Sequence, residues 1–213
     1  MTDPIPLPAA RRLAWCLWLA FLACYPLSQR MPPAWAWENG MLENIQVAML
    51  LAGALWALLA WRRLRPGPAA VLAACAVPVW LLLAGRECSW GAVFLPPIGF
   101  DKDGPVYASR ILWYRPLVGP FAGAVLGGLL LLAWRHRLGR LIKDLIVRRR
   151  FPWGILVVVV VVGYAATFAE GHLRPVTGFI FDQADAYEEL AELVGYLALL
   201  AMQGSVLREL AIR

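Results

Sequence analysis

The chain has 213 residues, of which 61% are hydrophobic and 16% charged, with a formal net charge of +6. This composition excludes an ordinary soluble domain, which could not bury so much apolar surface, whereas a lipid bilayer accepts it. A positive balance is also typical of nucleic-acid binding. Here the basic residues lie in short segments between long apolar runs, so we expect a membrane protein with no nucleic-acid partner.

The first two apolar segments differ in how they begin. Residues 12–27 follow Arg11 and Arg12, as in a signal peptide or a first membrane anchor. Because no Ala-x-Ala site follows, we expect an uncleaved membrane-spanning helix. The second segment, residues 38–61, begins with polar residues that include Glu38 and Glu43 and is apolar thereafter.

The third apolar segment, residues 69–86, ends on charged residues. Arg86 and Glu87 are followed by Ser89, Trp90 and a Gly/Pro-rich stretch up to residue 115, which we expect to form one long external loop. A charge at membrane depth costs about 3 kcal/mol even on the lenient insertion scale, so such a pair indicates a functional site. We expect Arg86 to be buried and paired with an acid from another span, either Glu43 or Glu192.

The remaining spans are predicted at residues 116–134, 151–169 and 187–207. The first of them carries Gly119, Gly123 and Gly127 at a spacing of four, a ridge that lets another helix approach closely. We expect this ridge to pack within the chain rather than to form a dimer. The basic stretch at 135–150 is typical of a topogenic loop, of an amphipathic helix on anionic lipid, or of both.

These segments predict an all-α, polytopic membrane protein with six transmembrane helices in one domain, residues 1–213. Both termini then lie on the same side, together with 14 of the 20 basic residues: Arg11, Arg12, Arg62, Arg63, Arg65, Arg135, Arg137, Arg140, Lys143, Arg148, Arg149, Arg150, Arg208 and Arg213. By the positive-inside rule that side is the cytoplasm, in a bacterial inner membrane.

The acidic residues are biased toward the opposite, periplasmic side. The predicted topology gathers glutamates from several spans at one membrane depth, near Arg86 and His172: Glu38, Glu43, Glu87, Glu170, Glu188, Glu189 and Glu192. Carboxylates so placed repel one another unless a cation neutralises them. We therefore expect a divalent cation with Glu43, Glu170 and Glu188 as ligands, assisted by His172. The simpler alternative is that these acids are solvated helix ends, favoured by the helix dipole at N-termini.

Cysteine and histidine give no support for zinc. The four cysteines show no Cys-x-x-Cys spacing, and there are only two histidines. We expect apolar packing for the cysteines rather than redox or structural-metal roles.

Three short segments carry a family resemblance: Glu38-x5-Asn44, Gly85-Arg-Glu-Cys-Ser-Trp-Gly91 and Glu188-Glu-x2-Glu192. They resemble a family of uncharacterised bacterial multi-spanning membrane proteins with a Gly-Glu-Glu-x-Ser-Trp-Gly segment, in which Arg86 here replaces the first Glu. The resemblance implies no established activity. Trp37-Glu-Asn-Gly-x2-Glu43-Asn is also similar to a calcium-binding segment of alkaline ceramidase-type membrane hydrolases. The three zinc-binding histidines of those enzymes are missing, so their chemistry does not carry over.

Three functions fit a periplasm-facing acidic and histidine pocket. In a cation-dependent enzyme acting on a lipid or lipid-linked substrate, Glu87 or Glu192 would be the general base with His172 as partner. Arg86, Ser89 and Trp90 would then bind the substrate. In an ion- or proton-coupled carrier, the glutamates would exchange protons or cations. A non-catalytic subunit would pack against other membrane subunits. Motifs for phosphate loops, dinucleotides or a nucleophile elbow are missing from the sequence.

The predicted topology is tested by labelling engineered cysteines from outside intact cells. In a background lacking the four native cysteines, we expect a membrane-impermeant thiol reagent to label Asp103→Cys and to leave Gly139→Cys unlabelled. The reverse pattern would overturn the orientation.

Overall fold

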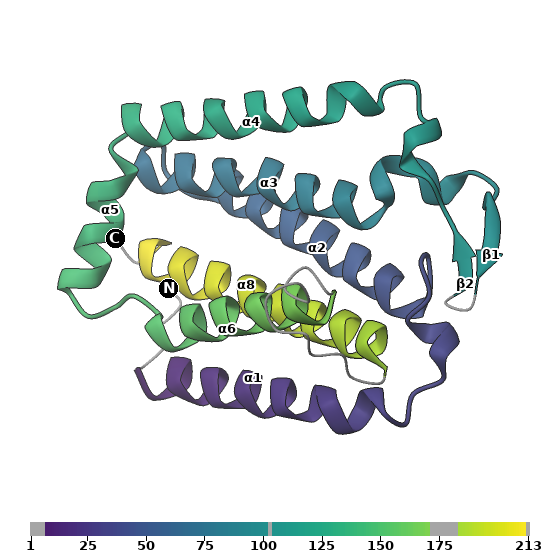
Figure 1. Cartoon of the computed structure of the whole chain (residues 1–213). Helices are drawn as coiled ribbons and strands as arrows, with labels where there is room; N and C mark the ends of the chain where they lie inside the picture. Colours follow the sequence, from purple (N-terminus) through teal and green to yellow (C-terminus); the bar gives the residue numbers. More distant parts are fainter. Residues whose placement is uncertain (1–6, 102–103, 171–182, 212–213) are drawn as a thin grey trace.

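The computed structural model describes residues 7–101, 104–170 and 183–211, and it is built of long, roughly parallel helices (Figure 1). These are α1 (Leu7–Ser28), α2 (Met41–Arg63), α3 (Pro68–Glu87), α4 (Arg115–Arg135), α6 (Trp153–Ala169) and α8 (Ala184–Ala211). A shorter helix, α5 (Leu138–Val147), runs across one end of the bundle, where α1 begins and α8 ends.

The segment predicted as one external loop contains short regular elements. It holds the 3-10 helices η2 (Ser89–Phe94) and η3 (Ser109–Ile111) and a hairpin of β1 (Gly99–Asp101) and β2 (Gly104–Val106); a further 3-10 turn, η1 (Pro33–Trp35), precedes α2. The antiparallel register places Gly99 opposite Val106. The hairpin lies at the end of the bundle away from α5 (Figure 1).

The prediction of an all-α protein is confirmed, and each predicted span overlaps one long helix. Four helices, α2, α3, α4 and α8, are long and apolar enough to cross a membrane by length and composition. The apolar helix α6 has 17 residues, which corresponds to about 25 Å. Membrane-spanning helices are therefore supported, whereas six spans and their orientation stay predictions.

Glycine and tryptophan set the closest approach among α2, α3 and α8. A Cβ atom added at Gly53 of α2 would lie 2.7 Å from two ring atoms of Trp80 on α3. Likewise, a Cβ at Gly204 of α8 would collide with the ring of Trp56 on α2. Small residues are the usual means of close helix packing in membranes, because lipid gives helices little hydrophobic reason to associate.

A second apolar core joins α1, α6 and α8. Its fully buried members include Leu17 from α1, Ile155, Val158 and Val162 from α6, and Ala198 from α8. The β-branched residues of α6 have few side-chain rotamers, so they lose little entropy when they pack. Since α8 belongs to both cores, it lies at the centre of the bundle and positions residues toward α2 and α3.

Helix α4 lies at the periphery, and the prediction for its glycine ridge is wrong. Only 6% of its apolar window is buried, and a Cβ atom added at Gly119, Gly123 or Gly127 would meet no described atom within 4 Å. The ridge therefore faces away from the rest of the described chain. A spacing of four places the three glycines on one face of the helix, but it does not tell whether that face points toward the bundle or away from it.

The basic stretch at 135–150 contains an amphipathic helix, as expected, whereas its contact with anionic lipid stays a prediction. In α5, Leu138 and Leu145 are buried, while Arg140 and Lys143 are exposed. Leu145 packs in a small core with Val206 and Leu210 of α8. The apolar face of α5 thus covers the end of the bundle and leaves its basic face outward.

Replacing Gly53 tests the packing of α2 on α3. We expect Gly53→Val to overpack this contact and to cost about 1–3 kcal/mol, seen as a lower Tm in detergent. Gly123→Val on α4 is the matched control, because its new side chain meets open space, and it should leave Tm unchanged. Equal Tm values for both variants would contradict this helix contact.

Candidate functional site

An ion pair between α3 and α8 forms the centre of the site. Arg86 donates hydrogen bonds from both terminal nitrogens to Oε1 of Glu192, each at 3.0 Å. The same guanidinium donates to Oε1 of Glu87 at 3.0 Å and to the hydroxyl of Tyr196 at 3.2 Å. The Tyr196 hydroxyl in turn donates to Glu87 at 2.7 Å. Both donors converge on Oε1 of Glu87, whose side chain is only 6% exposed.

A second polar contact links α2 to α8 beside this ion pair. Gln46, which is fully buried, donates from Nε2 to the backbone oxygen of Glu189 at 2.9 Å and to its carboxylate at 2.8 Å. Its other side-chain atom, Oε1, is buried and accepts no hydrogen bond from the described residues. An unsatisfied buried acceptor costs about 1–3 kcal/mol, so this atom marks a place suited to a proton donor or a cation.

Five glutamates from three helices lie within electrostatic reach of one another. We call them the glutamate cluster: Glu43 of α2, Glu87 of α3, and Glu188, Glu189 and Glu192 of α8. Glu87 is buried and the other four are half-buried. Glu170, which ends α6, is exposed but also acts electrostatically on Glu87 and Glu188. The predicted gathering of carboxylates at one end of the bundle is thus present in the structure.

Glu43 also has a structural role at the start of α2. Its carboxylate accepts a hydrogen bond from the backbone nitrogen of Asn39, and the Asn44 amide donates to the backbone oxygens of Asn39 at 3.0 Å and Gly40 at 2.7 Å. The Glu43 contact satisfies a backbone N–H just before α2, as in a capping box. The simpler prediction, that some of these acids stabilise helix ends, therefore applies to Glu43.

Glu38 fastens the loop that follows α3. It accepts hydrogen bonds from Ser89 Oγ at 2.9 Å and from the backbone nitrogen of Tyr107 at 3.1 Å. Ser89 and Trp90 both have positive φ angles, 44° and 57°, which turn the chain sharply after α3. This turn is tight enough that a Cβ on Gly85 would lie 3.0 Å from the Trp90 ring.

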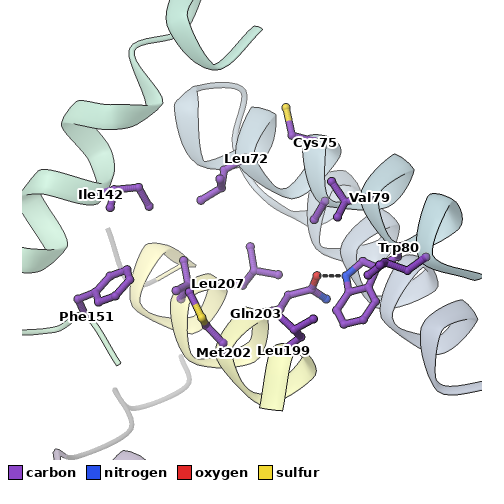
Figure 2. Close-up of a pocket in the computed structure, with 13 residues that line it drawn as sticks. Leu72, Cys75, Val79, Trp80, Ile142, Phe151, Leu199, Met202, Gln203 and Leu207 are labelled. Atoms are coloured by element: carbon purple, nitrogen blue, oxygen red, sulfur yellow. Dashed lines mark hydrogen bonds between the residues drawn. The ribbon is translucent and has the colours of Figure 1, made fainter. Parts of the chain in front are cut away.

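An apolar cavity of about 340 Å³ lies deeper in the bundle between α3, α5 and α8 (Figure 2). Its polar edge is a hydrogen bond of 2.6 Å from Trp80 Nε1 to Gln203, whose amide donates to the Gly53 oxygen at 3.2 Å. Gln203 is eleven residues after Glu192, about 16 Å along α8. The cavity is therefore separate from the glutamate cluster.

The predicted site residues reach different outcomes. Arg86 pairs with Glu192, one of the two partners expected, but its side chain is 48% exposed rather than buried, because it emerges at the end of α3. Ser89 donates a hydrogen bond to Glu38, and the backbone oxygen of Trp90 accepts one from Tyr114. A role of Ser89 and Trp90 in substrate binding stays a prediction. His172 lies outside the described residues.

The expected divalent-cation site does not assemble in the described part of the chain. Within residues 7–101, 104–170 and 183–211, no three Asp, Glu, Cys or His side chains gather as metal ligands. Glu43 caps α2, and Glu170 is exposed at the end of α6, so neither is arranged around a common centre with Glu188. Their assignment as ligands stays a prediction without support from this geometry.

Two residues central to the site were missed by the sequence reasoning. Tyr196 follows Glu192 by four positions, and Gln46 follows Glu43 by three, so each shares a helix face with a predicted glutamate. That helical spacing was a usable signal for both. What it could not supply was the hydrogen bond from Tyr196 to Glu87, which joins different helices.

Comparison with protein-family models, curated proteins and solved structures found no match to this chain. The family resemblances proposed from short motifs therefore stay predictions.

Removing one hydroxyl tests the network around Glu87. We expect Tyr196→Phe to lower the unfolding free energy by about 1–3 kcal/mol, because Glu87 loses a donor while it stays buried. Tyr164→Phe is the control, since Tyr164 is 65% exposed on α6. Thermal unfolding in detergent compares the two, and an unchanged Tm for Tyr196→Phe would mean that water replaces the hydroxyl.

Proposed function

We propose that this chain is a polytopic inner-membrane protein with six spans and cytoplasmic termini, whose glutamate cluster takes up and releases protons from the periplasmic side. Proton-coupled transport is the function that this geometry supports best. Support for the orientation comes from the basic residues, most of which lie at the end of the bundle opposite the cluster.

One observation carries this proposal: the cluster holds more negative than positive charge. Among the described residues, Arg86 is the cation paired with this cluster, so five ionised carboxylates would leave four negative charges there at the ends of apolar helices. Uncompensated charge in such surroundings is expensive, and close carboxylates repel, so cation uptake is favoured. The unsatisfied Oε1 of Gln46 would gain a hydrogen bond from a protonated neighbour.

Protons fit this site better than a chelated metal ion or a hydrolytic reaction. The described acids do not form a metal-ligand group, which a proton does not need. The hydrogen bonds that Glu87 and Glu192 accept from Arg86 all end on Oε1, so the Oε2 atom of each carboxylate can take up a proton. The cation-dependent enzyme acting on lipid therefore ranks below the carrier.

A subunit of a larger membrane complex is the second candidate, and α4 supports it. Its glycine ridge is open to a helix of another chain, and the helix contributes little to the described core. In this case Gly123→Val, which should not change Tm, would shift the protein to a smaller assembly in native mass spectrometry. An unchanged assembly would leave α4 as a lipid-facing helix.

Stability as a function of pH tests proton uptake by the surplus glutamates. Burial among other carboxylates disfavours the charged form of Glu188 and Glu189, so the folded state should bind protons that the unfolded state releases. Stability should therefore be highest near pH 5.5 and fall as the pH rises to 8.5. We expect Glu188→Gln/Glu189→Gln to flatten this dependence of Tm. Glu209→Gln, at the opposite end of α8, should keep it.

Proton transport is measured in proteoliposomes that enclose a pH-sensitive dye. A potassium diffusion potential should drive proton entry with the unmodified protein, and Glu87→Gln should abolish it while Glu209→Gln does not. A flat pH dependence of Tm together with equal fluxes for both variants would refute the proposal.

A further inference from the structure

A basic pocket lies at the end of the bundle away from the glutamate cluster. Its volume is about 1070 Å³, and its lining includes Arg63, the last residue of α2, Arg65 from the turn before α3, and Arg208 from the last turn of α8. We call it the arginine pocket. Its lining includes Leu141 of α5 and Ala211, the last residue of α8, so it lies at the end of the bundle that α5 crosses (Figure 1).

The pocket carries positive charge without described carboxylate partners. At this end of α8, Glu209 is paired with Arg150 at 3.6 Å, and no ion pair of Arg63, Arg65 or Arg208 is formed with another described residue. Gly67 and Pro68, which begin the 20-residue helix α3, also line the pocket. The free backbone N–H groups of a helix start favour an anion at the same place.

The rest of the lining is apolar, which makes the pocket suited to an amphiphile rather than to a free anion. Trp56, Leu59, Leu141 and Leu210 form much of its wall. The Trp56 ring packs against Gly204 of α8, yet Trp56 as a whole remains 37% exposed. Aromatic and aliphatic side chains beside arginines, at the end of membrane-spanning helices, match the boundary between lipid headgroups and acyl chains.

We propose that the arginine pocket binds an anionic phospholipid, with the headgroup phosphate among Arg63, Arg65 and Arg208 and the acyl chains along Trp56 and Leu59. The volume of the pocket exceeds what a phosphate group alone would fill, and it is similar to that of large ligand sites. This site is independent of the proton-exchanging cluster, because the two lie at opposite ends of α2, α3 and α8.

The test measures binding of phosphatidylglycerol to the purified, delipidated full chain by native mass spectrometry and by the change in Tm. We expect Arg63→Gln/Arg65→Gln/Arg208→Gln to weaken binding by about tenfold or more, since basic residues at the membrane surface attract anionic lipid additively. The control Arg62→Gln/Arg148→Gln/Arg149→Gln removes equal charge from exposed positions at the same end outside the pocket, and it should weaken binding less than about twofold. If the triple variant does not fold, the single variant Arg208→Gln replaces it in this test, and we expect it to show a smaller loss of phosphatidylglycerol binding.

Two further probes identify the source of the phosphate. Phosphatidylcholine should bind much more weakly than phosphatidylglycerol, and inorganic phosphate should neither stabilise the protein nor displace the lipid. If both triple variants lost phosphatidylglycerol binding equally, the lipid would be attracted by the general positive charge of the surface, and the proposal would be overturned. Equal binding of phosphatidylcholine, or arginine-dependent binding of inorganic phosphate that displaces phosphatidylglycerol, would overturn it as well.

Discussion

Glu87 imposes the main constraint on this fold, because it is a carboxylate buried at the end of an apolar helix. Its Oε1 atom accepts from Arg86 and from Tyr196, and Arg86 is held in turn by Glu192. Removing one partner from such an arrangement leaves a charge that neither lipid nor apolar side chains can solvate. The end of α3 can therefore adopt its position only if α8 presents Glu192 and Tyr196 at the same depth, which sets the register between these helices.

The register is repeated along α8. Glu189, Tyr196 and Gln203 are spaced by seven residues, as are Gln46 and Gly53 on α2 and Trp80 and Glu87 on α3. One layer joins Gln46 to Glu189, and a deeper layer joins Trp80 and the Gly53 oxygen to Gln203. A spacing of seven keeps residues on one face of packed helices. Polar contacts thus hold three apolar helices together where lipid would otherwise compete equally for their surfaces.

The sequence allowed the helices and part of the site to be predicted, for identifiable reasons. Apolar runs bounded by charges gave the helix positions, and alternation of sides placed Arg86, Glu87 and Glu192 at one depth. Depth does not give direction around a helix axis, however. For that reason Arg86 was expected to be buried but is half-exposed, and the ridge at Gly123 was expected to pack inward but points outward. To predict that Tyr196 contacts Glu87, one must know how α3 and α8 are rotated relative to each other, and no local sequence pattern contains that information.

Helix α4 has a connection to the site despite its peripheral position. The residue before it, Tyr114, donates a hydrogen bond of 2.7 Å from its hydroxyl to the backbone oxygen of Trp90. The Trp90 ring lies on Gly85, the residue that precedes Arg86, so the first turn of α4 contacts the loop that terminates α3. A helix from another chain that docked on the ridge at Gly123 would restrict α4, and through Tyr114 it would restrict the position of Trp90. The start of α4 and the glutamate cluster are therefore joined by a short series of contacts, from Tyr114 to Trp90 and from the Trp90 ring to Gly85 beside Arg86.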